Sequence, residues 1–202
     1  MRRLAVLFLA GLLLADEPAL PDLEQARKVM ESRLEAAKAL RAKGDVAGAE
    51  KEQREAVRAC DAVLAEVTRL AASRTAALLD SKARVQERYL AAVQLGRLKA
   101  KEGVPALAKA LENDASEVVR RAAAWSLGQM PRYAADAAPV LIRNVGGERP
   151  YVGWMCDRAL GEIARTLFDE TPSMGFDLKG SADERRAAQE RWRLWWKDKN
   201  AR

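Results

Sequence analysis

The residues that could support catalysis or metal binding are few. The 202-residue chain contains no histidine, which excludes histidine-dependent triads, the usual zinc sites and the commonest general base. Its two cysteines, Cys60 and Cys156, are too far apart in the sequence to form a metal knuckle. Four acidic residues near the C-terminal end lack the spacing of a known calcium loop: Asp157, Asp169, Glu170 and Asp177. We therefore expect no enzymatic activity, no catalytic residue, no cofactor and no metal site.

A local excess of positive charge is the main remaining chemical feature. Between Lys82 and Gly103, six basic residues are opposed only by Glu87 and Glu102: Lys82, Arg84, Arg88, Arg97, Lys99 and Lys101. A solvated helix surface explains this stretch, and so does attraction to an acidic partner or to an anionic surface of the cell envelope. The net charge of +6 is too small and too dispersed to predict a specific nucleic-acid site.

Six basic residues are the candidates for a partner surface: Arg84, Arg88, Arg97, Lys99, Arg120 and Arg121. Two of them, Arg88 and Arg120, occupy equivalent positions in an internal repeat. Arginines in such positions more often tie a helix to an acidic neighbour or a carbonyl group than contact a ligand. Both interpretations stay open from the sequence.

The segments that must position these side chains recur along the chain. Arg-Tyr-Leu-Ala-Ala-Val-Gln-Leu-Gly at 88–96 is followed by a similar phrase at 120–128 and a weaker copy at 155–161. Their Leu-Gly pairs end at Gly96, Gly128 and Gly161, at intervals of 32 and 33 residues. A second phrase, with proline in its second position, recurs at 104–111 and 138–145. Two short apolar-periodic segments in a period of this length predict a stack of helical repeats.

Each repeat is expected to be a pair of helices. Apolar residues recur at three- and four-residue steps in the Leu-Gly segments, and the prolines fall in the first turn of the partner helices. Asp114 or Ser116 is predicted to cap the following helix. The glycine after the last buried leucine is suited to a left-handed helix end, although the helix can also continue past it.

Residues 75–164 resemble HEAT repeats, in particular the short HEAT-like class whose profiles are named after phycobilisome lyases. The most specific motif is Asp-Ala-Ser-Glu-Val-Val-Arg at 114–120, followed by Leu127-Gly128. The other copies depart from it, since Glu87 replaces a valine and Gly153 stands where an arginine is usual. The resemblance implies an α-solenoid whose concave face binds another protein. A lyase activity would rest on fold analogy alone.

Residues 22–80 are predicted to form a helical hairpin. The apolar stripe of the first helix stops at Gly44, and no glycine or proline interrupts residues 49–95. A second helix of about 34 residues, ending near Leu79, is therefore expected to join the hairpin to the repeats. The alanine-rich seam is narrow and also fits a coiled coil with another chain, so we expect a monomer or a hairpin-mediated dimer. A tetratricopeptide unit is less favoured because its aromatic and Leu-Gly positions are absent.

Residues 1–15 are predicted to be a secretory signal peptide. Arg2 and Arg3 precede an apolar run at 4–14, which is shorter than the roughly 20 residues that span a membrane. Residues 16–21 are a linker. We expect an exported protein, periplasmic or extracellular, without a transmembrane segment in the mature chain. Retention of the N-terminal segment as an anchor is the alternative.

Residues 165–202 are predicted to be an ordered loop and a capping helix. Ser181 and Glu184 have the spacing of a capping box, and Trp192, Trp195 and Trp196 share one helix face. The combination of Gly175-Phe-Asp, an Asp-Glu-Arg-Arg helix start and Arg191-Trp-Arg-Leu-Trp-Trp resembles the closing module of some exported bacterial HEAT-repeat proteins. A bulky helix can cover the last apolar surface of a repeat stack. The alternative is an exposed aromatic platform for a sugar or a peptide.

Together these patterns predict an all-α protein: a helical hairpin that runs into a short HEAT-like solenoid, closed by a tryptophan-rich helix. The favoured function is a non-catalytic protein–protein interaction module of the cell envelope or the secreted fraction. The alternative is binding of an anionic polymer or envelope surface through the basic stretch 82–103. Cys60 and Cys156 are predicted to be unbridged and buried, since a bridge needs close α-carbons and distant repeats seldom touch.

Overall fold

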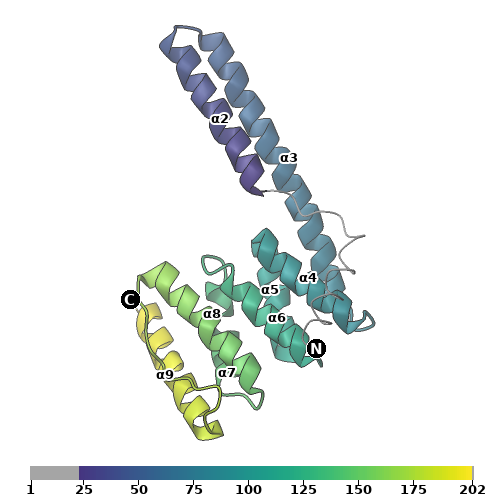
Figure 1. The fold of residues 1–202 in the computed structure, drawn as a ribbon, viewed down its shortest axis with the longest axis vertical. Helices are drawn as coiled ribbons and strands as arrows, with labels where there is room; N and C mark the ends of the chain where they lie inside the picture. The colour runs from purple at the N-terminus through teal and green to yellow at the C-terminus, as the bar shows by residue number, and fades with distance from the viewer. Residues whose placement is uncertain (1–22, 202) are drawn as a thin grey trace, which may run out of the picture. The chain divides into compact units, whose positions relative to one another are not determined.

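The computed structural model describes residues 23–201 (Figure 1). The predicted signal peptide at 1–15 and the linker at 16–21 lie outside these residues. Within them the chain forms eight α-helices and two short 3-10 helices without a β-strand, which confirms the all-α prediction. The helices are α2 (Leu23–Ala42), α3 (Val46–Leu79), α4 (Val85–Leu98), η1 (Lys101–Gly103), α5 (Val104–Asn113), α6 (Glu117–Gly128), η2 (Ala135–Ala137), α7 (Ala138–Val145), α8 (Pro150–Phe168) and α9 (Ala182–Asn200).

The described residues divide into two compact units, 23–63 and 64–201, and the division falls within α3. α3 is one uninterrupted helix of 34 residues, over the segment for which the sequence predicts a single long helix. None of the helices in the described part of the chain is both long and apolar enough to span a membrane.

In the first unit, α2 and the beginning of α3 form an antiparallel hairpin. Gly44 has a φ of +83° at the turn, a conformation that glycine adopts without the steric penalty of a side chain. The seam is narrow because it is made largely of buried alanines, namely Ala37, Ala49 and Ala56. Arg33 of α2 also forms an ion pair with Glu52 of α3, with 3.0 Å between Nη1 and Oε2.

The second unit contains two layers of helices (Figure 1). The Leu-Gly helices α4, α6 and α8 pack side by side in one layer, and α5, α7 and α9 follow one another in the second. α5 packs on α6 and α7 packs on α8, so each pair is one repeat step. Between the layers lie fully buried aliphatic side chains, including Leu95, Leu107, Leu111, Leu127, Leu141, Val145, Leu160 and Ile163.

The repeated glycines act through close helix packing rather than through a left-handed helix end. α4 continues past Gly96 to Leu98, and a Cβ atom built on Gly96 would lie 2.8 Å from the Cα of Ser126 in α6. A Cβ on Gly128 would lie 3.2 Å from the Cα of Ala159 in α8. At Gly161 a Cβ would meet nothing within 4 Å. The small residue is therefore needed where another Leu-Gly helix follows.

The starts of the repeat helices agree with the sequence in part. Pro105 and Pro139 lie in the first turns of α5 and α7, as predicted. Ser116 is the N-terminal capping position of α6, but its hydroxyl forms no capping hydrogen bond. The backbone N–H of Ser116 donates instead to Oδ1 of Asp114 at 2.8 Å.

The C-terminal helix α9 packs against α7 and takes the place of the next helix in the second layer. It begins with the capping box that the sequence predicts, in which the Ser181 side chain and the Glu184 side chain each accept a backbone N–H. Trp192 is 1% exposed and donates its indole N–H to Oδ1 of Asp157 at 2.7 Å. Trp195 stacks edge-on against Phe168, with ring centroids 5.3 Å apart.

Both cysteines are unbridged. Cys156 is fully buried in α8, and its burial raises the pKa of its thiol well above the ordinary range. Cys60 is only half-buried, with its Sγ 3.2 Å from the Sδ of Met30. The prediction of burial was therefore wrong for Cys60, because the two-helix hairpin leaves part of its seam open to solvent.

Candidate functional site

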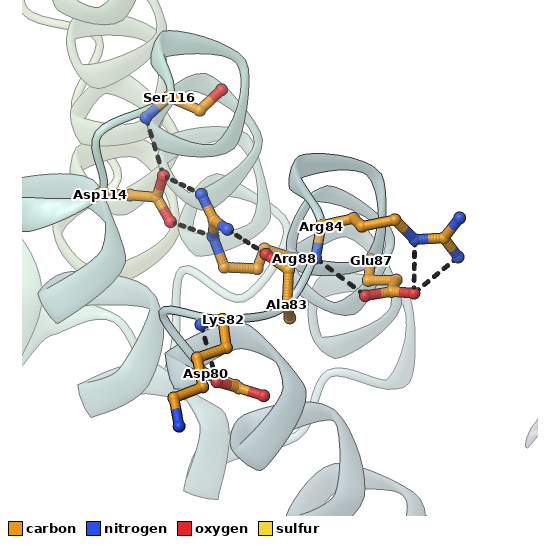
Figure 2. Close-up of polar contacts among 8 residues, drawn as sticks. All are labelled: Asp80, Lys82, Ala83, Arg84, Glu87, Arg88, Asp114 and Ser116. Carbon is orange, nitrogen blue, oxygen red and sulfur yellow. Dashed lines mark hydrogen bonds and ion pairs between the residues drawn. The ribbon is translucent and has the colours of Figure 1, made fainter.

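Arg88, one of the six candidates for a partner surface, is held inside the repeat (Figure 2). Its Nε and Nη2 donate to the two carboxylate oxygens of Asp114 at 2.8 and 3.0 Å, and Nη1 donates to the carbonyl of Ala83. The side chains of Arg88 and Asp114 are only 10% and 7% exposed. Arg88 therefore connects α4 to the α5–α6 loop and does not belong to an exposed surface, which corrects its assignment as a partner residue.

The charge of Asp114 is stabilised by this arrangement. Burial alone would raise the pKa of its carboxyl, but the hydrogen bonds from Arg88 and from the Ser116 N–H outweigh burial and lower that pKa. A bidentate guanidinium–carboxylate pair is among the stronger hydrogen-bonded contacts in proteins. The pair therefore stabilises the first repeat by joining α4 to the α5–α6 loop.

The other candidate residues have different environments. Arg84 is exposed and binds Glu87 one helical turn away, with its Nη2 2.7 Å from Oε1 (Figure 2). Arg120 is half-buried and donates from Nη2 to Oδ1 of Asn144 at 2.8 Å. The guanidinium of Arg121 lies 5.2 Å from the ring centroid of Tyr151. Arg97 is exposed on α4.

Lys99 is the candidate that lies in a surface groove. It follows α4 in the left-handed conformation, with a φ of 50°. The groove has a volume of about 400 Å³ and lies on α6 and α8, next to the C-terminal end of α4. Its lining residues are Lys99, Trp125, Gly128, Gln129, Pro131, Met155, Arg158, Ala159, Glu162 and Arg165. We refer to this feature as the repeat groove.

The repeat groove combines apolar surface with positive charge. Trp125 and Met155 are half-buried, so part of each side chain is accessible. Arg165 is paired with Glu162, whereas within residues 23–201 neither Lys99 nor Arg158 forms an ion pair with a carboxylate. The guanidinium of Arg158 lies 5.2 Å from the centroid of the Trp154 ring. The groove can therefore accept an apolar side chain next to a negative charge.

Sequence reasoning missed most of this groove. Trp125 lies among the apolar residues that recur at three- and four-residue steps in its Leu-Gly segment, a pattern typical of a buried helix face. Val93, Trp125 and Arg158 occupy the same position in the three Leu-Gly helices, at intervals of 32 and 33 residues. The change from an apolar residue to arginine at this position is a signal that the recurring position faces solvent.

Three of the four acidic residues singled out near the C-terminus have structural partners, namely Asp157, Glu170 and Asp177. Asp157 accepts the indole N–H of Trp192, and Glu170 accepts that of Trp195 at 2.9 Å and also binds Lys199. Asp177 accepts the backbone N–H of Lys179 at 2.9 Å. In the part of the chain that the structure describes, no three histidine, cysteine or carboxylate side chains are grouped so that they could hold a metal ion.

The paired helices, the two layers and the 32- to 33-residue spacing are typical of stacked helical repeats. Residues 72–161 match the family model for HEAT repeats. This range supports a HEAT-repeat protein, and it includes most of the 75–164 segment identified from the sequence. No curated protein matches the chain. HEAT repeats are generally scaffolds for protein interactions, and the family is typically non-catalytic.

Most of the residues that line the repeat groove lie within the matched segment, and the others follow its C-terminal end. Lys99, Trp125 and Arg158 lie inside the matched residues, and Glu162 and Arg165 follow directly on the same helix, α8. The helices α2 and α9 lie outside the match. The groove is thus built mainly from the Leu-Gly helices of the repeats.

Proposed function

We propose that this chain is a non-catalytic interaction module whose HEAT-like repeats bind an acidic segment of another protein in the repeat groove. The observation that carries the proposal is the combination of Trp125 and Met155 with the cations of Lys99 and Arg158. Tryptophan, methionine and arginine are enriched in protein interfaces, and a few such anchors contribute most of the binding free energy.

The backbone of Lys99 adds support to this proposal. A side chain other than glycine or asparagine is uncommon at a φ of 50° and costs about 1 kcal/mol or more. A lysine in this position places a cation at the edge of the groove at some cost to stability. Strained positions of this kind are often found at binding sites.

The alternative function, binding of an anionic polymer through the basic stretch 82–103, has less support. Arg84 is paired with Glu87 and Arg88 is buried with Asp114. Two of the six cations of the stretch are therefore engaged within the protein. Polymer binding would weaken steeply as salt concentration rises, whereas an interface with a packed apolar anchor would weaken less.

A charge-reversal experiment tests the groove. Full-length wild-type protein and the double variant Lys99→Glu/Arg158→Glu are used to capture partners from the native host, and the affinity for the recovered partner is then measured. We expect at least about a tenfold loss of affinity in the double variant, because two favourable charges become repulsive. The matched control, Arg97→Glu/Arg132→Glu, reverses two exposed cations outside the groove and should bind like the wild type. An equal loss in both double variants would contradict binding in the groove.

We also propose that the module acts in the cell envelope or outside the cell. The support is the sequence of residues 1–15, in which two arginines precede a short apolar run. N-terminal sequencing of the protein from its native host tests this proposal. A mature chain that begins near Asp16 is expected, and an intact Met1 in the cytoplasmic fraction would contradict export.

A further inference from the structure

Arg88 and Arg120 occupy equivalent positions in successive repeats but have different surroundings. Each arginine lies eight residues before the glycine of its Leu-Gly pair. In the first repeat the guanidinium of Arg88 and the N–H of the α6 capping residue, Ser116, both bind the carboxylate of Asp114 (Figure 2). A negative charge therefore occupies the space between the arginine and the start of the next Leu-Gly helix.

The following repeat has the same arginine but lacks the carboxylate. The capping residue of α8 is Arg149, so the position that corresponds to Asp114, two residues earlier, is Gly147. Arg120 donates from Nη2 to the neutral side chain of Asn144, and its buried Nε has no hydrogen-bond partner within the described residues. At the capping position, Arg149 stands where the first repeat has Ser116.

These residues surround a small pocket. Its volume is about 190 Å³, and it is lined by Arg120, Asn144, Gly147, Glu148, Arg149 and Val152. Burial, and then the nearby positive charge of Arg149, lower the pKa of the Arg120 guanidinium, and the carboxylates of Asp114 and Glu112 offset only part of this decrease. Glu148 is the one acidic residue of the lining; it is exposed, and no ion pair joins it to Arg120 or Arg149 in the described structure.

We propose that this pocket binds a carboxylate supplied by an acidic side chain of a partner protein, in the place that Asp114 fills in the preceding repeat. The guanidinium groups of Arg120 and Arg149 provide the donors, and Asn144 holds Arg120 in position. The assignment of the ligand to a partner protein rests on the proposed interaction function, whereas the carboxylate site itself does not. The pocket involves the beginning of α6 and α8, and it shares no residue with the repeat groove.

The first test supplies the carboxylate from within the chain. A Cβ atom on Gly147 would lie 3.4 Å from the nearest atom, the carbonyl oxygen of Asn144, which is an ordinary contact. Gly147→Asp should therefore fold and raise Tm by about 2 °C or more, because it recreates the charge-assisted hydrogen bonds of the first repeat. Gly147→Asn, the matched neutral control, should give less than half of this rise. Equal Tm values for the two variants would overturn the proposal.

The second test uses acetate as the probe, at constant ionic strength against chloride. Acetate at 100 mM should raise the Tm of the wild type by about 1 °C or more and shift the Nε–Hε NMR signal of Arg120. Both effects should be largely lost in Gly147→Asp and in Arg149→Gln. Arg149 is exposed, so its substitution should leave the fold intact. The same Tm rise in all three proteins would be a general salt effect and would overturn the proposal.

Two further experiments test whether the pocket prefers a carboxylate to phosphate and whether Glu148 already occupies it. Inorganic phosphate that stabilises the wild type while acetate does not would overturn the assignment to a carboxylate. Glu148→Gln should enlarge the effect of acetate, since it removes a competing negative charge. If acetate does not stabilise the wild type but does stabilise Glu148→Gln, Glu148 itself fills the site and the proposal fails. Neither arm needs a protein partner, so these results are independent of the repeat groove.

Discussion

Arg88 and Arg120 show how one repeat position can have different roles. Arg88 forms a buried bidentate pair with Asp114, whereas Arg120 is half-buried and binds the neutral Asn144. The sequence predicts their equivalence from their distance to the Leu-Gly pairs. It does not show that, of these two arginines, Arg88 alone is hydrogen-bonded to a carboxylate within residues 23–201, because that carboxylate lies 26 residues away in the loop before α6.

Asp114→Asn should destabilise the protein at neutral pH, because it leaves the guanidinium of Arg88 buried without an ion pair. Removal of one partner of a buried pair costs about 3 kcal/mol or more in the free energy of unfolding. The pKa of Asp114 is lowered in the folded state, so its contribution is present above the ordinary pKa of about 4 and is lost as pH falls through the folded-state pKa.

Urea unfolding of the wild type and Asp114→Asn between pH 7 and pH 3 measures this contribution. The difference in unfolding free energy should be largest near pH 7 and should shrink below about pH 4. Glu87→Gln, which breaks the exposed pair with Arg84, is the control and should have a much smaller effect. A difference that does not vary with pH would contradict the role of the ion pair.

The pKa of Asp157 is shifted in the opposite direction to that of Asp114. Its burial raises the pKa of the carboxyl, and the hydrogen bond from Trp192 offsets only part of this rise. Asp157 therefore favours folding most when it is protonated, at low pH, and this stability is lost as pH rises through the folded-state pKa. Asp157→Asn keeps an acceptor for the Trp192 N–H and removes the charge of this half-buried side chain.

We expect Asp157→Asn to be at least as stable as the wild type at pH 7, and the advantage to disappear at acid pH. Asp157→Ala should lower the free energy of unfolding by about 1 to 3 kcal/mol, because the indole N–H of Trp192 would be buried without a partner. Chemical denaturation of both variants at pH 7 and pH 4 gives the comparison. Equal losses for asparagine and alanine would show that the charge itself is required.

The Leu-Gly helices explain why glycine recurs along the layer of α4, α6 and α8. Gly96 and Gly128 lie where the next helix of the layer approaches closely, whereas Gly161 of α8 faces open space. A single sequence signal therefore has two structural outcomes. The difference depends on whether another Leu-Gly helix follows in the stack, and the sequence of a single Leu-Gly segment does not show this.

Substitution of each of these three glycines by alanine should change the stability of the protein by a different amount. Gly96→Ala places a Cβ 2.8 Å from the Cα of Ser126 and should cost about 1 to 3 kcal/mol through overpacking. Gly128→Ala should cost less, since its closest contact would be 3.2 Å. Gly161→Ala should stabilise α8 by about 0.5 to 1 kcal/mol through the better helix propensity of alanine. Thermal melting of the three variants measures the order, and a destabilising Gly161→Ala would contradict this account.

α9 provides a second comparison, between buried and half-buried tryptophans. Trp192 is 1% exposed, whereas Trp195 and Trp196 are half-buried around Phe168. Trp192→Ala should lower the free energy of unfolding by about 3 to 5 kcal/mol, and Trp196→Ala should lower it clearly less. Urea titration measures both. A small effect of Trp192→Ala together with loss of a bound sugar or peptide would favour an exposed aromatic platform.

Over the whole chain, the sequence predicts the elements better than the surfaces. The 32- to 33-residue spacing and the prolines at the helix starts predict the repeat helices, and the lack of glycine or proline after Ala49 predicts α3. The repeat groove could not be predicted, because it joins residues of α6 and α8 with residues that follow α4 and α6, and the exposure of these residues depends on packing between repeats. Of the six candidate surface residues, Lys99 is the one that lines this groove.

Site-specific photo-crosslinking in the native host tests the proposed binding in the repeat groove most directly. A photoreactive amino acid replaces Gln129, an exposed residue of the groove, or Lys109, an exposed residue of α5 in the other helix layer. The proposed function predicts a discrete crosslink to one acidic protein from position 129, a weaker one after Lys99→Glu/Arg158→Glu, and none from position 109. Crosslinks to that protein from position 109 with none from position 129 would contradict it.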